Sequence, residues 1–247
     1  MVRSVTVDLL RNAPLLAVLP PAALNELAAT AVFVSRRSGA RIFEDGSTAD
    51  SCYVLTSGRA KIVITGTDGA DIVIGFVQPY TLVGEIALID AMPRSAGFVA
   101  VDDCHLVRIP GPHFLRLRRF DTFNEQLMIH LAATVRRATE QLRAIYTFDA
   151  LERVAWCVAQ SAATRGSVAG REMVLTPKPS HRELAEMTGS SRETVSRALQ
   201  RLRQRRWLRW DDDSIYMDTK VFRRYFRTPE HSSLEPTVES TPALRGV

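Results

Sequence analysis

The sequence predicts an α+β fold: an antiparallel β-roll, then a long helix, then a C-terminal domain of short helices with a small hairpin. From Val32 to about Arg108 apolar residues recur with a period of two, which is typical of strands. From Met128 to Ile145 they recur at spacings of three and four, which is typical of one face of a helix. Two helical segments with capping residues then meet at Gly189.

The composition fits this organisation. The chain has 247 residues, of which 46% are hydrophobic and 24% charged, and this is enough core-forming sequence for two ordinary domains. Its net charge of +5 indicates a polyanionic partner only if the positive charge is concentrated in one place. We assign a first domain to residues 1–123, a helix to 124–148, a second domain to 149–228, and a disordered tail rich in Pro, Ser, Thr and Glu to 229–247.

The first domain begins with helices and continues with strands. Leucines at helical spacing over residues 1–30, interrupted by Pro14 and Pro20-Pro21, predict two or three short helices. Residues 60–64 and 71–76, with Gly66 and Gly69 between them, predict two strands joined by a hairpin. Short apolar runs punctuated by glycine up to residue 108 indicate the antiparallel β-roll.

The segment from Gly84 to Ala96 places an acid and a base nine residues apart around a short turn. Gly84 lets the backbone approach a phosphate, and successive amide groups can bind an anion. Arg94 supplies a planar guanidinium for phosphate oxygens, and Glu85 can accept a hydrogen bond from a ribose hydroxyl. The alternative is a turn with a surface ion pair. The first interpretation describes a ligand site that needs no catalysis.

Three stretches together resemble the cyclic-nucleotide-binding domain in their order and spacing: residues 39–46, 53–61 and 84–96. In that family the Gly-Glu and Arg pattern is the phosphate-binding cassette. The resemblance implies a cyclic nucleotide as effector, with cassette contacts from Gly84, Glu85, Ile86, Arg94 and Ser95.

The long helix carries an apolar seam whose members are separated by three and four residues, namely Met128, Leu131, Val135, Ala138, Leu142 and Ile145. Such a seam predicts pairing with a second copy of the same helix, parallel and with C2 symmetry. The alternative is that the seam packs against its own domain, as amphipathic helices often do.

The second domain contains a helical stretch from Leu151 to Ala163, a break over residues 165–170, and then two helices around a tight turn. Ser180 and Ser191 stand at N-cap positions, and Glu183 lies at capping-box spacing from Ser180. The second helix exposes a polar side that can contact bases, formed by Arg192, Glu193 and Arg197. Ser180, Ser191 and Thr194 can hold phosphates. The alternative is an ordinary solvated helix face.

The distribution of charge favours nucleic acid. Residues 180–228 hold twelve Arg and Lys against seven Asp and Glu, and five of the arginines lie between Arg201 and Arg209. Most of the positive excess therefore lies on and just after the second helix, where phosphate contacts are expected. Residues 207–217 then predict a two-stranded wing.

The run Ser191-Arg-Glu-Thr-Val-Ser-Arg197 resembles the recognition helix of the CRP/FNR family of bacterial transcription factors. Arg192, Glu193 and Arg197 fall on that family's three base-contacting positions. With the β-roll, the long helix and the winged helix-turn-helix in the same order, the resemblance covers residues 10–226. It implies a homodimer that binds palindromic double-stranded DNA with TGTGA-like half-sites, about one helical turn or ~34 Å apart, and that recruits or blocks RNA polymerase.

One departure from that family concerns the purine of the effector. In cAMP-responsive members two adjacent hydroxyl residues on the dimer helix contact the adenine, and Ala138 and Thr139 occupy those positions here. Thr139 is the remaining candidate contact. The effector is expected to be cAMP, with another nucleotide such as cGMP, or no nucleotide response, left open. A ligand that bridges the cassette and Thr139 would shift the balance between two orientations of the DNA-binding domains, hinged at about Asp149.

The sequence contains no residue pattern that supports a metal-binding, haem-binding, enzymatic or membrane-spanning protein. Cys52, Cys104 and Cys157 lack metal-ligand spacing, so reduced and mostly buried thiols are expected, with no iron–sulfur cluster and no metal. His105, His113 and His130 lack a haem-binding constellation and are interpreted as surface or packing residues. No catalytic set is apparent, so no enzyme is expected. No apolar run reaches 18 residues and no leader is visible, which favours a cytoplasmic protein without a membrane span.

Overall fold

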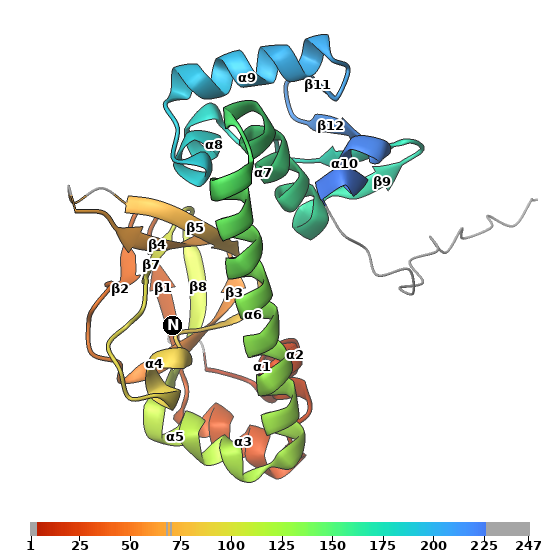
Figure 1. Ribbon diagram of the computed structural model, residues 1–247. Coiled ribbons are helices and arrows are strands. Elements are labelled where there is room, and N and C mark those ends of the chain that lie inside the picture. Colours follow the sequence, from red (N-terminus) through yellow and green to blue (C-terminus); the bar gives the residue numbers. More distant parts are fainter. Residues whose placement is uncertain (1–3, 68, 70, 226–247) are drawn as a thin grey trace, which may run out of the picture.

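The computed structural model describes residues 4–67, 69 and 71–225, and it confirms the α+β fold (Figure 1). The predicted tail at 229–247 lies outside the described residues. Eight strands of the N-terminal half form two four-stranded antiparallel sheets. One sheet has the order β1 (Val32–Arg36), β8 (Cys104–Pro110), β3 (Ser51–Ser57), β6 (Leu82–Val83). The other has the order β2 (Arg41–Phe43), β7 (Gly97–Ala100), β4 (Ala60–Thr65), β5 (Asp71–Val77).

The two sheets enclose one apolar core, and the first sheet forms a second core with the helices. Leu55 and Leu106 from the first sheet and Phe98 from the second are fully buried in the same cluster. Below it, the N-terminal helices α1 (Val7–Arg11), α2 (Pro14–Ala17) and α3 (Pro21–Thr30) pack with α5 (Gly111–Arg116) around Phe114 and Phe123. The short helices α4 (Ile86–Ile89) and η1 (Leu117–Arg119) complete this half.

Helix α6 (Asp121–Thr147) runs along one side of the β-roll, from the end occupied by α3 and α5 to the C-terminal domain (Figure 1). Its N-terminal turns bury Phe123 and Leu127, and near its end Ala144 is buried in the C-terminal core. The amide of Gln141 donates to the carbonyl of Ile74 on β5. One helix therefore contacts both halves of the molecule.

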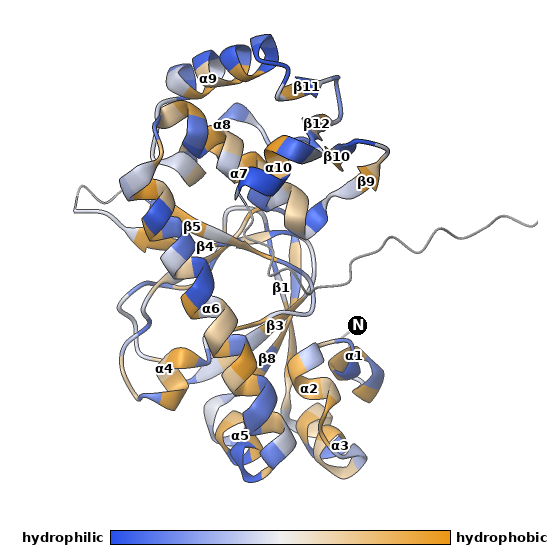
Figure 2. Cartoon of the chain, turned by 45° about the vertical axis from the view of Figure 1, so that its right-hand side comes forward, coloured by the Kyte–Doolittle hydropathy of each residue, from blue (hydrophilic) through white to orange (hydrophobic). Residues whose placement is uncertain are grey.

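The predicted seam of α6 is mostly exposed in the chain. Met128 and Val135 are each 65% exposed, Leu142 and Ile145 are exposed as well, and so is Ala138. Figure 2 shows hydrophobic residues recurring along α6 between hydrophilic ones.

Leu131 departs from the predicted seam because it packs against the core of the first domain. It follows Leu127 by four residues, and residues four apart share one face of a helix. Leu131 therefore lies on the inward face of α6, between the exposed seam residues Met128 and Val135.

The C-terminal domain begins where α6 ends. Phe148 and Asp149 have extended backbones, and the Asp149 carboxylate caps α7 (Ala150–Arg165) by accepting from the Glu152 amide at 2.8 Å. Helices α8 (His181–Thr188), α9 (Arg192–Gln204) and α10 (Thr219–Tyr225) pack with α7 around one core. The three cysteines of the protein are free and buried, as predicted.

The wing is larger than the two strands predicted. β11 (Leu208–Trp210) and β12 (Ile215–Asp218) continue into β10 (Glu172–Leu175) and β9 (Ser167–Ala169), giving the order β11-β12-β10-β9. The segment interpreted as a break is therefore a hairpin. Gly170 turns it with a φ of +60°, and the alternate residues Met173 and Leu175 are buried.

Candidate ligand and nucleic-acid sites

The cassette is built on a turn that requires glycine. Gly84 joins β6 to α4 with a φ of +90°, and a Cβ atom there would lie 2.5 Å from Nη1 of Arg94. Glu85 follows at the N-cap of α4. Any larger residue at position 84 would displace the guanidinium as well as strain the backbone. Gly84, which the motif predicted, is therefore needed because the guanidinium of Arg94 lies where a side chain at position 84 would be.

Arg94 lies inside the β-roll, with only 4% of its surface exposed. Its Nη1 donates to the carbonyl of Gly84 and its Nη2 to the carbonyl of Ser51, each at 2.5 Å. The guanidinium lies 4.2 Å from the centre of the Phe43 ring. Burial lowers the pKa of Arg94, although neighbouring groups that include Asp50 and Glu85 oppose the shift.

This arginine is an under-satisfied buried cation. Its Nε has no hydrogen-bond partner, and no carboxylate forms an ion pair with it among residues 4–67, 69 and 71–225. A buried cation of this kind is stabilised by an anion that can approach it. The arrangement fits a phosphate at the cassette, where the Arg94 guanidinium would exchange a carbonyl partner for a charged one.

Glu85 is also 4% exposed, and its partner comes from α6. Oε1 of Glu85 lies 3.0 Å from Nε2 of His130. The interpretation of His130 as an ordinary surface or packing residue is therefore incomplete, because its ring contacts a residue of the cassette. No sequence signal pointed to this pair, since the two residues are 45 positions apart.

The remaining predicted ligand residues are not all near this pair. Ile86 is half-buried and Ser95 is exposed at the cassette surface. Thr139 is exposed on α6, and its hydroxyl donates to the carbonyl of Val135 at 3.0 Å. Within the described residues no hydrogen bond joins Thr139 to the cassette. The contact that α6 makes with the cassette by hydrogen bond, among the described residues, is that of His130 with Glu85.

The two helices of the C-terminal motif begin on the predicted caps. The Ser180 hydroxyl accepts from the Glu183 amide at 3.1 Å, and the Glu183 carboxylate accepts from the Ser180 amide at 2.7 Å. Ser191 caps α9 by accepting from the Thr194 amide at 3.1 Å. Gly189 turns between the helices with a φ of +61°. The Ser191 hydroxyl also lies 2.9 Å from the Thr194 hydroxyl, and one of these two hydroxyls donates to the other.

The face of α9 opposite its buried side is free. Val195, Ala198, Leu199 and Leu202 are buried, while Arg192, Glu193 and Arg197 are exposed. The Glu193 side chain is 78% exposed and the Arg197 side chain 66%, and the two form an ion pair of 3.4 Å. A surface pair of this kind is weak, so both groups are available to a ligand. α9 lies at the edge of the domain, and Arg192 at its start faces the β5 side of the β-roll (Figure 1).

Arginines around the wing stack on aromatic rings. Arg205 and Arg224 lie 5.4 Å and 4.8 Å from the ring centre of Trp207. Arg203 lies 5.1 Å from that of Trp210. Stacking holds the planar groups in place without using their N–H donors, which leaves those donors for phosphate oxygens.

α8 is docked on the β-roll of the same chain. Arg59 of the turn before β4 pairs with Glu183 at 2.9 Å, and Lys61 on β4 pairs with Glu186 at 2.7 Å. Met187 packs beside the same strands, against the cluster formed by Val63, Val73 and Val99. These contacts fix the orientation of the helix-turn-helix relative to the β-roll.

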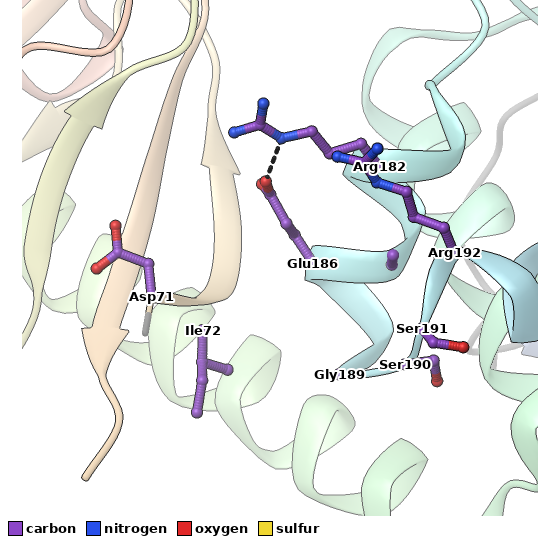
Figure 3. Close-up of a pocket in the computed structure, with 9 residues that line it drawn as sticks. Asp71, Ile72, Arg182, Glu186, Gly189, Ser190, Ser191 and Arg192 are labelled. Carbon is purple, nitrogen blue, oxygen red and sulfur yellow. Dashed lines mark hydrogen bonds and ion pairs between the residues drawn. The ribbon is translucent and has the colours of Figure 1, made fainter. Parts of the chain in front are cut away.

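A cavity of about 400 Å³ lies beside this contact. Figure 3 shows Asp71 and Ile72 of β5 on one side, and Arg182 and Glu186 of α8 with Arg192 of α9 on the other. Arg182 pairs with Glu186 at 2.9 Å. The cavity is open and of mixed charge, which is typical of a contact between domains rather than of a small-molecule site.

Two further properties bear on function. No group of three or more His, Cys, Asp and Glu side chains is placed to hold a metal ion in the part of the chain that the structure describes. None of its helices, over the same residues, combines the length and apolarity that a membrane span needs.

Comparison with known proteins agrees with both halves of this description. Residues 33–120 match the cyclic nucleotide-binding domain, and residues 152–220 match the Crp-like helix-turn-helix domain. The chain is 28% identical over 210 residues to the CRP-like cAMP-activated global transcriptional regulator of Mycobacterium tuberculosis, covering 84% of this chain and 93% of that one. It is 32% identical over 165 residues to the cyclic AMP receptor protein of Thermus thermophilus, covering 66% and 73%. The solved structure of the c-di-GMP-responsive global regulator CLP of Xanthomonas campestris is similar with a TM-score of 0.63 at 19% identity, covering 81% and 99%.

Proposed function

This chain belongs to the CRP/FNR family of transcription regulators, and we propose that it acts as a homodimer whose binding to specific DNA is modulated by cAMP. The observation that carries the DNA-binding part is the exposed face of α9, where Arg192, Glu193 and Arg197 project from a helix whose other side is buried. A transcription regulator with a cyclic nucleotide-binding domain has a non-enzymatic role.

The proposed DNA contacts follow from the chemistry of α9. Arg192 and Arg197 can each donate two hydrogen bonds to guanine O6 and N7, and Glu193 can accept from a cytosine amino group. Ser180, Ser191 and Thr194 lie at helix starts and contact phosphates. The expected sites are palindromes with TGTGA-like half-sites, and RNA polymerase is the partner through which such a regulator acts. Its DNA target places it in the cytoplasm.

The homodimer is supported by the exposed apolar face of α6. Met128, Val135, Leu142 and Ile145 are more than half exposed, and Ile129 and Tyr146 beside them are exposed too. Large apolar side chains recurring along one exposed helix face favour an interface over solvent exposure. A second α6, related by a two-fold axis, covers this face with the same residues and sets the spacing of two α9 helices.

The effector is proposed from the cassette. Arg94 is a buried cation without a carboxylate partner among the described residues, and Glu85 lies beside it as the acceptor for a ribose hydroxyl. Two relatives carry cAMP in their names, which favours cAMP. We propose that Gly84, Glu85, Ile86, Arg94 and Ser95 bind the sugar phosphate, and that Thr139, presented by the partner chain of the dimer, contacts the base.

A second candidate is a DNA-binding regulator with weak or no dependence on a cyclic nucleotide, in which the sensor is a structural and protein-interaction module. Two observations favour it. Ala138 offers the purine no hydroxyl, and both charged cassette residues already have partners inside the chain, Arg94 with two carbonyls and Glu85 with His130. A different effector is a further outcome, since a protein of the same fold responds to c-di-GMP.

Allosteric control would act at the junction of α6 and α7. Phe148 and Asp149 interrupt the helix with extended backbones, so a small change in their torsions reorients the C-terminal domain. Release of the Arg59–Glu183 and Lys61–Glu186 contacts would accompany such a rotation. A ligand favours one orientation to the extent that it binds the two states with different affinities.

The deciding experiment measures the affinity of the full-length protein for palindromic and random DNA at fixed salt, with cAMP, with cGMP and without nucleotide. Titration calorimetry with both nucleotides accompanies it for the wild type, Arg94→Leu and Arg37→Leu, the last an exposed control arginine. We expect heat with cAMP from the wild type and the control, and none from Arg94→Leu. Specific DNA binding without heat from any protein would support the second candidate, and equal affinity for both DNAs would contradict the DNA-binding proposal.

A further inference from the structure

We propose that His130 is a positioning residue of the ligand site, which holds the Glu85 carboxylate for the ribose hydroxyl and links the cassette to α6. The inference rests on the proposed binding of a cyclic nucleotide at this cassette. It adds a residue that the sequence motif does not contain.

The geometry of the pair sets the direction of the hydrogen bond. Glu85 is 4% exposed and its Oε1 lies 3.0 Å from His130 Nε2. An ionised carboxylate can only accept, so His130 Nε2 carries the proton in this bond. Oε2 of Glu85 and the second lone pair of Oε1 stay available to a hydroxyl donor. The histidine therefore orients the carboxylate without consuming its capacity to bind.

Positioning matters here because a glutamate has three rotatable side-chain bonds. A buried carboxylate without a partner would turn toward water or become protonated, and in either case it would accept poorly from a ribose hydroxyl. A fixed carboxylate loses less entropy when the ligand arrives. The contribution of His130 is thus expected specifically for ligands that carry the ribose 2′-hydroxyl.

The Glu85–His130 hydrogen bond also links the cassette mechanically to α6. His130 belongs to α6, whose next turns carry the exposed apolar residues Val135 and Leu142 and whose end leads to Asp149. Its backbone carbonyl accepts from the Thr134 hydroxyl at 3.0 Å, within the helix. A ligand that changes the position of Glu85 therefore acts on α6 through one hydrogen bond. The same contact can pass occupancy of the cassette to the helix that leads into the DNA-binding domain.

The test uses full-length protein and compares cAMP with 2′-deoxy-cAMP by titration calorimetry. The variants are His130→Leu, which removes the donor, and His130→Gln, which retains an N–H donor. His113→Leu is the control, because this half-buried histidine contacts Arg116 on α5, away from the cassette. We expect the wild type and the control to prefer cAMP. His130→Leu should weaken cAMP roughly tenfold and leave 2′-deoxy-cAMP nearly unchanged, and His130→Gln should restore most of the preference.

A second readout addresses the link to α6. At saturating cAMP, the factor by which cAMP changes DNA affinity should be smaller in His130→Leu than in the wild type, while His130→Gln and His113→Leu keep the wild-type factor. An unchanged factor in His130→Leu would overturn the link.

The outcomes separate the inference from the proposal beneath it. If the wild type binds neither nucleotide, the proposed effector site fails and this inference fails with it. If the wild type binds cAMP but His130→Leu weakens both ligands equally, or neither, only the positioning role of His130 is overturned. Thermal unfolding of each variant shows whether a loss of binding reflects a loss of fold.

Discussion

The cassette and the recognition helix use the same two residue types in opposite settings. In the cassette, Glu85 and Arg94 are each 4% exposed and already have partners within the chain. On α9, the side chains of Glu193 and Arg197 are 78% and 66% exposed and, among the residues that the structure describes, form an ion pair only with each other. The acid and the base of the cassette are thus buried in a core, whereas those of α9 stand on a surface.

Because of this difference, the two sites respond differently to a ligand. The α9 face is preformed, because its helix is fixed by buried apolar residues and the side chains of Glu193 and Arg197 are exposed. At the cassette a phosphate must compete with the hydrogen bonds that Arg94 already makes to the carbonyls of Gly84 and Ser51. A substitution in the cassette should therefore change stability and binding together, whereas one on α9 should change binding alone.

The largest expected effect is on the stability of the β-roll. Arg94→Leu leaves the buried carbonyl of Ser51 and the partly buried carbonyl of Gly84 without the Arg94 donors, which costs about 2 to 5 kcal/mol in the free energy of unfolding. The exposed Arg37→Leu should change it by less than about 0.5 kcal/mol. Chemical denaturation followed by hydrogen exchange of β-roll amides measures this difference.

The tryptophans supply an internal control for that experiment. All three, Trp156, Trp207 and Trp210, belong to the C-terminal domain, so intrinsic fluorescence follows that domain. Arg94→Leu should shift the β-roll transition with little change in the fluorescence transition. If both transitions stay at the wild-type midpoint, the buried Arg94 side chain does not stabilise the β-roll.

The next effect is on DNA recognition. Arg192→Ala should weaken binding to a specific site by about 1 to 3 kcal/mol and relax preference at one base pair, because a bidentate contact to guanine is lost. Its free energy of unfolding should stay within about 0.5 kcal/mol of the wild type, since the side chain is exposed. Fluorescence anisotropy with sites varied at each base pair measures it. A large loss of stability would mean that Arg192, like the cassette residues, also supports the fold.

A smaller and less selective effect is expected from Arg205 at the C-terminal end of α9. Arg205 is exposed and stacks on Trp207, so Arg205→Ala should weaken specific and random DNA alike. The slope of log affinity against log salt should fall in magnitude by about 1, as for the loss of one phosphate contact. Measurements at several salt concentrations check this, with Arg192→Ala alongside. A loss confined to specific DNA would make Arg205 a base-contacting residue.

Much of both sites could be predicted from the sequence because local rules determine them. Gly84, Gly189 and the caps Ser180 and Ser191 appear where predicted, since a turn or a helix start is decided within a few residues. Periodicity likewise predicted the β-roll and α6. These features depend on neighbours along the chain, which a single sequence displays.

The features that the sequence did not predict depend on contacts between distant segments. The Glu85–His130 bond joins residues 45 apart, and the Lys61–Glu186 bond joins residues 125 apart. Leu131 fitted the seam by spacing, but the inward face of α6 is set by the domain it packs against. β9 was missed because it pairs only with β10, and all three of its residues are exposed.

The smallest expected effect is on the contact between α8 and the β-roll, and it should depend on pH. Burial alone would raise the pKa of Glu186, but the hydrogen bonds and charges of Lys61 and Arg182 outweigh it, and the pKa is lowered from its ordinary value of 4.5. A carboxyl whose folded pKa lies below its unfolded value stabilises the folded state above the unfolded pKa, and this contribution disappears as pH falls through the folded pKa.

Glu186→Gln should therefore be less stable than the wild type by under about 1 kcal/mol at pH 7, since the pair is partly exposed, and the difference should shrink below about pH 4.5. Fluorescence-detected unfolding between pH 3 and pH 7 measures it, with Glu193→Gln as the control because its side chain pairs within α9 and not with the sensor. A difference that persists unchanged at pH 3 would mean that the Glu186 charge does not hold α8 against the β-roll, and that the two regions are joined by apolar packing around Met187 instead.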